Sequence, residues 1–148
     1  MLNPSNHVLF AVIDNKKEQE HFLEALSAIR IKAQVRFISS HEQLINLLSS
    51  NADEGSEKYL EPNLILLVAE LNNLASIDLI KKLKSLDKAK KIPLIIVSKD
   101  HNDSQLRSAY RLGAASVIKH PSHFESMLKI LQVLDEYWFN TVKLPVAQ

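Results

Sequence analysis

The sequence predicts an α/β fold in which a doubly wound, five-stranded parallel sheet carries helices on both faces. Three observations lead to this prediction: five short apolar runs occur along the chain, amphipathic stretches separate them, and no internal repeat interrupts the alternation. Strands that alternate with helices pair in parallel through right-handed crossovers. A length of 148 residues suits a single domain with a substantial core.

The first elements are read from apolar runs and caps. Residues 7–13 are continuously apolar, which is typical of a strand buried on both faces. Apolar residues then recur at helical spacing through 14–30, where Asp14 or Asn15 can cap a helix. A second strand with partial alternation is expected at 33–39.

The middle of the chain continues the alternation. Ser40 is placed to cap a helix over 41–48, and the polar stretch 49–62 is expected to be a surface loop. The most hydrophobic run, 63–69, predicts the third strand, and the amphipathic run 76–86 predicts the third helix.

The last third predicts two further strands, each with a helix behind it. A strand at 92–98 precedes a helix at 103–114, which Gly113 is suited to end in a left-handed conformation. A short strand at 115–119 then leads to a long helix at 122–142.

The long last helix has two features of its own. Ser122 and Glu125 have the spacing of a capping box. Its apolar surface is broader than one stripe, so part of it is a candidate protein interface. The alternative is that Trp138 and Phe139 fold back onto their own domain. The candidate interface residues are Val133, Tyr137, Trp138 and Phe139.

Composition bounds the function. A net charge of +1 argues against nucleic acid, and no apolar run approaches the roughly 20 residues of a membrane helix. Without cysteine, disulfides and thiolate catalysis are impossible, and a cytoplasmic location is expected. We expect one domain over 1–148, with its core at about 7–134 and an extended last helix and tail to 148.

Ligands of such sheets collect outside the carboxyl ends of the strands. At these ends stand Asp14, residues 68–70, Ser98 and His120. The surrounding segments "PNLILLVAELNN", "KIPLIIVSKD" and "SAYRLGAASVIKHPSHFESMLKIL" resemble the receiver domain of two-component response regulators, over His7 to Pro145. The resemblance implies a CheY-like, flavodoxin-like sheet order of 2-1-3-4-5 and a stand-alone domain in phosphorelay signal transduction.

The resemblance also implies site positions, at which this sequence departs from the family. The family's acidic pair corresponds to Ile13 and Asp14, its phospho-accepting aspartate to Val68, and its hydroxyl to Ser98. The family's lysine corresponds to His120, before Pro121, and its aromatic switch residue to Val117. Receivers often carry a cis bond where His120–Pro121 stands.

These departures predict an atypical receiver that is not phosphorylated and is not an enzyme. A valine cannot form an aspartyl phosphate, and Asp14 alone is a poor magnesium site, so we expect Mg²⁺ binding to be weak or absent. An alternative is a phosphorylatable regulator that uses Glu70, two residues and about 6.6 Å beyond Val68 if the strand continues.

Two further hypotheses concern His120. With Ser98 and Asp14 it has the residue types of a small hydrolase, although no Gly-x-Ser-x-Gly elbow is present. Alternatively, it pairs with Asp14 as a pH-sensitive contact. The expected partners of the domain are proteins: a histidine kinase, another receiver or a second copy of this chain. The histidines show no metal-ligand spacing.

Overall fold

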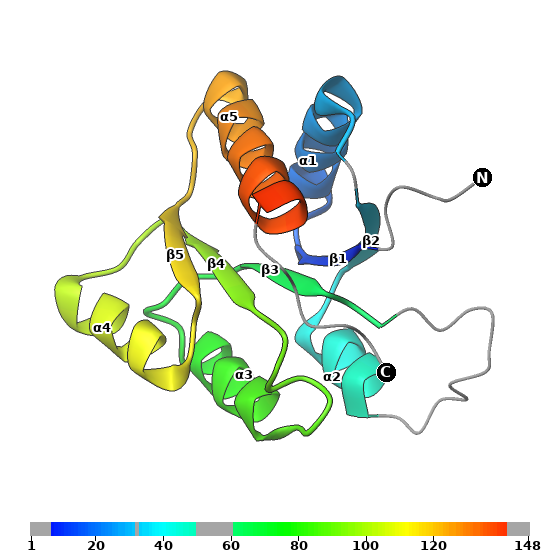
Figure 1. Cartoon of the computed structure of the whole chain (residues 1–148). Coiled ribbons are helices and arrows are strands. Elements are labelled where there is room, and N and C mark those ends of the chain that lie inside the picture. The colour runs from blue at the N-terminus through cyan, green and yellow to red at the C-terminus, as the bar shows by residue number, and fades with distance from the viewer. Residues whose placement is uncertain (1–6, 32, 50–60, 142–148) are drawn as a thin grey trace.

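The computed structural model describes residues 7–31, 33–49 and 61–141. Its five strands form one parallel sheet in the order β2-β1-β3-β4-β5, which confirms the expected order (Figure 1). The strands are β1 (Val8–Val12), β2 (Gln34–Ile38), β3 (Leu64–Val68), β4 (Leu94–Ser98) and β5 (Ser116–Lys119). β3 therefore lies at the centre of the sheet, and β2 and β5 lie at its edges.

Helices cover both faces of the sheet, as the sequence predicts. On one face lie α1 (Lys16–Ile29) and α5 (Phe124–Leu134), and α5 continues as a π-helical segment, η1 (Asp135–Thr141). The other face carries α2 (His41–Ser49), α3 (Leu74–Ser85) and α4 (Asp103–Leu112), as Figure 1 shows. None of the helices described is long and apolar enough to cross a membrane.

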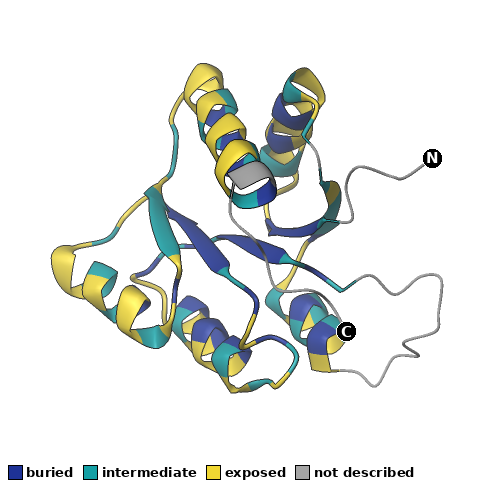
Figure 2. Ribbon diagram, in the orientation of Figure 1, coloured by how far each residue is buried: buried dark blue, intermediate teal, exposed yellow. Residues whose placement is uncertain are grey.

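Each face of the sheet has its own hydrophobic core, and β3 contributes to both. Leu66 belongs to the cluster that includes Phe22 of α1 and Leu131 of α5, whereas Leu67 belongs to the cluster that includes Ile80 of α3. Neighbouring residues of a strand point to opposite faces, so a continuous apolar run is what a strand between two cores requires. Figure 2 shows this burial in the central strands.

Most of the predicted caps are confirmed. The Asn15 side chain accepts the N–H of Glu18 at 3.0 Å, and Ser40 Oγ accepts the N–H of Gln43 at 3.0 Å. Gly113 ends α4 with φ of 115°, in the left-handed region that glycine adopts at least cost.

The capping box predicted for the last helix is wrong. α5 begins after His123, and that residue makes no side-chain capping bond. The third helix begins earlier than expected, because Asn73 caps it by accepting the N–H of Ala75 at 2.8 Å. Most of the polar stretch predicted as a loop, 50–60, and the tail at 142–148 lie outside the described residues.

Candidate functional site

A cavity of about 320 Å³ lies at the carboxyl edge of the sheet. The register sets Val68 opposite Val97, and Val12 opposite Leu67, so the ends of β1, β3 and β4 lie level with one another. The cavity is lined by Asp14, Asn15, Glu18, His41, Val68, Ala69, Glu70, Asn73, Ser76, Lys99 and His120. The sequence therefore predicts this location and many of its residues.

Val68 ends β3 and gives the cavity a hydrocarbon wall. Its side chain is half-buried and packs at the margin of the core beneath α1 and α5. It offers neither a nucleophile nor a metal ligand. Next to it, the two positions that end β1 differ from each other: Ile13 is fully buried, whereas Asp14 is exposed and reaches the cavity.

Glu70 is held by the neighbouring loop. β3 ends at Val68, so the carboxylate of Glu70 does not continue the strand. One oxygen accepts the N–H of Lys99 at 2.7 Å, and the other accepts the N–H of Asp100 at 3.1 Å. These two bonds use the carboxylate to join the loop after β3 to the loop after β4. The hypothesis that Glu70 replaces the missing acid receives no support from this arrangement.

Ser98, the last residue of β4, is fully buried and bonds to the loop after β3. Its Oγ accepts the N–H of Leu71 at 3.4 Å, and the residue does not line the cavity. Neither ring nitrogen of His120 bonds to it. The Ser98–His120–Asp14 arrangement of a hydrolase is therefore not assembled, because catalysis needs a hydrogen-bonded chain from nucleophile to base to acid.

His120 pairs with a residue that the sequence reasoning missed. Its Nε2 contacts Glu18 Oε1, in the first turn of α1, and its Nδ1 lies 2.9 Å from the carbonyl oxygen of Pro121. The expected pairing with Asp14 is wrong, because Glu18 is the acid that reaches the ring. The residues lie 102 positions apart, and no sequence pattern joins them. The His120–Pro121 bond is trans, as are all the described peptide bonds.

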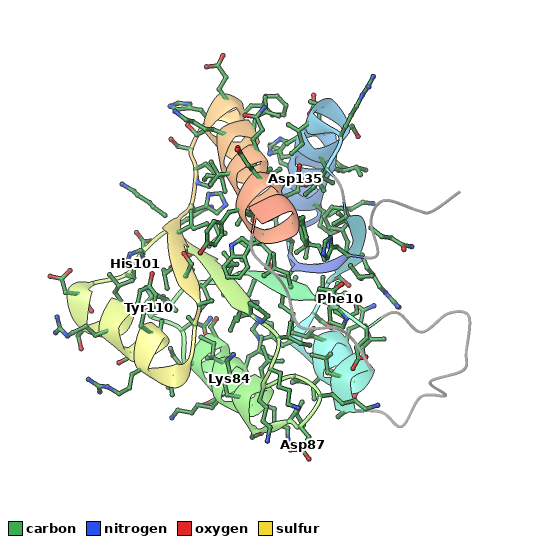
Figure 3. All side chains as sticks on the ribbon, viewed as in Figure 1. Phe10, Lys84, Asp87, His101, Tyr110 and Asp135 are labelled. Atoms are coloured by element: carbon green, nitrogen blue, oxygen red, sulfur yellow. The ribbon has the colours of Figure 1, made fainter. Side chains whose placement is uncertain are left out.

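A tyrosine also approaches the position of the missing aromatic switch. Val117 is half-buried on the edge strand β5, and its N–H donates to the hydroxyl of Tyr110 at 3.0 Å. Figure 3 shows Tyr110 on α4, beside that strand. Tyr110 therefore covers a backbone donor at the sheet edge. The helical period of α4 gave no sign of this contact.

The residues of the cavity do not fit a magnesium ion. Within the described ranges, no group of three or more His, Cys, Asp or Glu side chains could hold a metal ion. The carboxylate of Glu70 is occupied by backbone donors, and that of Glu18 by His120. Magnesium prefers oxygen ligands in near-octahedral geometry, and Asp14 alone supplies too few of them.

The four candidate interface residues of the last helix differ in how far they are exposed. Val133 is 58% exposed and Tyr137 49% exposed, so both reach the surface. Trp138 is half-buried and meets the Tyr137 ring edge-on at 5.1 Å. Phe139 is buried in the core beneath α1 and α5. Trp138 also packs against this core, so the alternative in which Trp138 and Phe139 fold back onto their own domain applies to both, fully for Phe139 and in part for Trp138.

Comparisons with known proteins agree with this geometry, although no family model matches the chain. The response regulator Rcp1 of Synechocystis sp. is 23% identical over 140 residues, which cover 95% of this chain and 94% of that protein. A response regulator in red light signalling of R. palustris, RPA3017, superposes with a TM-score of 0.80 at 22% identity, covering 95% of this chain and 99% of that one. The chain has the receiver fold.

A second solved structure agrees. The phosphorylated cyanobacterial phytochrome response regulator RcpA matches with a TM-score of 0.75 and 20% identity, over 95% of this chain and 99% of that one. These matches confirm the resemblance to stand-alone receiver domains. In this receiver-like domain, the cavity lies at the edge of the sheet where the resemblance places the phosphorylation site.

Proposed function

We propose that this chain is an atypical receiver domain that acts in two-component signalling by protein contact, without phosphorylation of an aspartate. The observation that carries the proposal is Val68, a hydrocarbon at the strand end where the resemblance places the acceptor. An aspartyl phosphate requires a carboxylate nucleophile. Glu70, the acid nearest in sequence, already accepts two backbone hydrogen bonds.

Labelling with a phosphoryl analogue tests this part of the proposal. The full chain is titrated with Mg²⁺ and beryllofluoride, and its amide resonances are followed by NMR. We expect residues 68–70 and 98–100 to stay unshifted, because Val68 offers no acceptor oxygen and Asp14 alone supplies too few ligands to hold Mg²⁺ with the analogue. RcpA, whose structure is named as phosphorylated, serves as the positive control. Shifts that disappear in Glu70→Gln would instead support a phosphorylatable regulator that uses Glu70.

A groove between β5 and α5 supports a role in protein contact. Its volume is about 560 Å³, and its floor is mostly apolar. Lys119 and Lys129 are among the residues that line it, and no acidic residue of the described chain does so. Val133, more than half exposed, connects the groove to the surface that includes Tyr137. An apolar strip bordered by lysines suits a partner with apolar and acidic side chains.

The partner classes to test are a histidine kinase, another receiver and a second copy of this chain. Two of the similar structures are named for red light or phytochrome signalling, so a phytochrome-type histidine kinase is the first kinase to try. The proposal includes a cytoplasmic location, which a chain without cysteine permits.

A pair of matched substitutions tests the contact surface. Val133→Glu places a charge on the proposed surface, and Leu23→Glu places one on α1 at a similarly exposed leucine, 55% against 58% for Val133. We expect Val133→Glu to weaken self-association or kinase binding at least tenfold, by light scattering and titration calorimetry. Leu23→Glu should leave self-association unchanged. Equal effects of both variants, or a wild-type chain that binds none of the three partners, would contradict the proposal.

A further inference from the structure

Two cavities meet at the Glu18–His120 pair. The smaller one is the 320 Å³ cavity beside Val68, and the larger one, of about 510 Å³, lies between the start of α1 and the connection from β5 to α5. Four residues line both cavities: Asn15, Glu18, Lys99 and His120. The pair therefore stands in the partition between the two spaces.

The pair is well enclosed and joins distant parts of the chain. The side chain of His120 is 12% exposed and that of Glu18 is 17% exposed. Glu18 is held in the first turn of α1, where Asn15 accepts its backbone N–H. His120 directly follows β5 and donates its own backbone N–H to the carbonyl oxygen of Ser98 at 3.0 Å. The contact thus connects α1 to the sheet edge through two ordered backbone positions.

The ring of His120 faces an oxygen at each nitrogen. Nδ1 faces the Pro121 carbonyl and Nε2 faces the Glu18 carboxylate. A carbonyl and an ionised carboxylate only accept hydrogen bonds, and a neutral imidazole has a single N–H to donate. The arrangement is complete only when both nitrogens carry a proton, which makes His120 a cation opposite the anion of Glu18.

We propose that the Glu18–His120 pair is a pH-dependent latch that ties α1 to the β5–α5 connection and keeps the two cavities apart. As pH rises through the range in which imidazoles lose their proton, one nitrogen of His120 becomes an acceptor that faces another acceptor. The ring then loses its charge and keeps at most one of its two hydrogen bonds, so the latch loosens and the partition between the two cavities opens. The latch is closed while His120 carries both protons and Glu18 is ionised.

Other charged groups surround the latch and could respond to pH in its place. The larger cavity is lined by Lys17, His21 and Glu24 of α1 and by His123, which directly precedes α5. Lys99 reaches both cavities from the end of β4. The smaller cavity adds Asp14, Glu70 and His41. The three other histidines therefore have to be separated from His120 in any test.

An NMR titration of the full chain separates them. The histidine ring signals and the backbone amides of residues 15–21 and 119–124 are followed between pH 5 and 8.5. We expect the amide shifts of both segments to follow the titration curve of the His120 ring. Glu18→Gln and His120→Gln should each abolish that shared transition. His21→Gln and His123→Gln, which change imidazoles of the same cavity, should leave it in place.

Three outcomes would overturn the latch. The transition could survive His120→Gln, it could disappear in His21→Gln or His123→Gln, or the His120 ring could titrate while the amides of α1 stay still. If either latch variant fails to fold, the wild-type curves alone decide, because they show whether α1 responds together with the ring. The latch does not rest on the proposed function, because it depends only on the contacts of Glu18 and His120 and its test uses no phosphoryl analogue.

Discussion

Val68 is a hydrocarbon at the position of the sheet edge where the resemblance implies a carboxylate. A carboxylate there would line the same cavity as Asp14 and Lys99. Valine instead adds apolar packing at the margin of a core, where burying an aliphatic side chain stabilises the fold by about 1.5–3 kcal/mol when burial is complete. Valine at this position therefore stabilises the fold and contributes no ligand to a metal ion.

Val68→Asp should destabilise the fold and create a binding site for Mg²⁺. We expect the substitution to lower the free energy of unfolding by about 1–3 kcal/mol, because a half-buried charge replaces a hydrocarbon. Mg²⁺ should restore part of the loss, since the new carboxylate and Asp14 would then line one cavity. Urea denaturation with and without Mg²⁺ measures both effects.

Val68→Asn is the matched control, because it has nearly the same shape as the aspartate but no charge. Mg²⁺ should raise the urea midpoint of Val68→Asp and leave those of Val68→Asn and the wild type unchanged. A wild-type midpoint that rises as much as that of Val68→Asp would show that the cavity already holds the ion.

Lys84, on α3, provides a second test at the scale of one residue. Its stem lies against Gly113, so that a Cβ added to the glycine would lie 2.9 Å from Lys84 Cε. Figure 3 shows Lys84 on that helix. Desolvation by burial lowers the pKa of Lys84 below its ordinary value. The folded state therefore releases this proton at lower pH than the unfolded state does, and the charged form destabilises the fold at neutral pH.

Lys84→Met should stabilise the protein at pH 7, because it keeps the apolar stem and removes the desolvated charge. Between the lowered pKa and the ordinary lysine value of about 10.4, the unfolded chain binds the extra proton, so wild-type stability rises with pH. The advantage of Lys84→Met should therefore shrink toward pH 10. Urea midpoints at both pH values measure it, with the exposed Lys81→Met as control. An advantage that stays constant with pH would contradict desolvation as its cause.

At the scale of elements, the loops after β3 and β4 act as one unit. Glu70 holds the amides of Lys99 and Asp100, and Ser98 holds that of Leu71. Two hydrogen bonds thus cross between the loops and end on one carboxylate, and a third joins the loop after β3 to the last residue of β4. Bonds to a charged acceptor are stronger than neutral ones, so Glu70 contributes most of the connection.

Glu70→Ala should loosen both loops. We expect faster hydrogen exchange at Lys99 and Asp100, and a loss of about 1–2 kcal/mol in the free energy of unfolding, because two charge-assisted bonds disappear. Glu70→Gln keeps one acceptor oxygen and should protect one of the two amides. Asp78→Ala, at an exposed acid of α3, should change neither amide. Unchanged exchange in Glu70→Ala would show that the loops are held in another way.

The same elements show what sequence reasoning can and cannot reach. Gly113 as a cap, and Asn15 as one of two candidates with Asp14, can be predicted because a cap acts on its own helix, within a few residues. The Glu18–His120 contact escaped prediction because the fold brings it together, not the local sequence. The prediction that Ser122 caps the last helix was wrong for a different reason. α5 begins one residue later, after His123, so the capping-box spacing does not apply.

At the scale of the whole molecule, the sheet order was predictable because strand–helix alternation, together with the resemblance, leaves few topologies. Which helices share each of the two cores could not be predicted from the sequence. It depends on how α1 and α5 pack on one face while three helices pack on the other. Since both cores share the sheet, we expect neither face to unfold alone.

Adjacent leucines of β3 test this cooperativity. Leu66 and Leu67 are each 0% exposed and point into different cores. Leu66→Ala and Leu67→Ala should each lower the free energy of unfolding by about 2–5 kcal/mol, the usual range for a buried leucine.

The single tryptophan, Trp138, reports on the face with α1 and α5, and far-ultraviolet circular dichroism reports on all helices. Because both cores pack on the same five-stranded sheet, the two signals should share one midpoint in both variants. A Leu67→Ala chain that loses helix signal while Trp138 fluorescence stays native would mean that the sheet supports two separately unfolding halves.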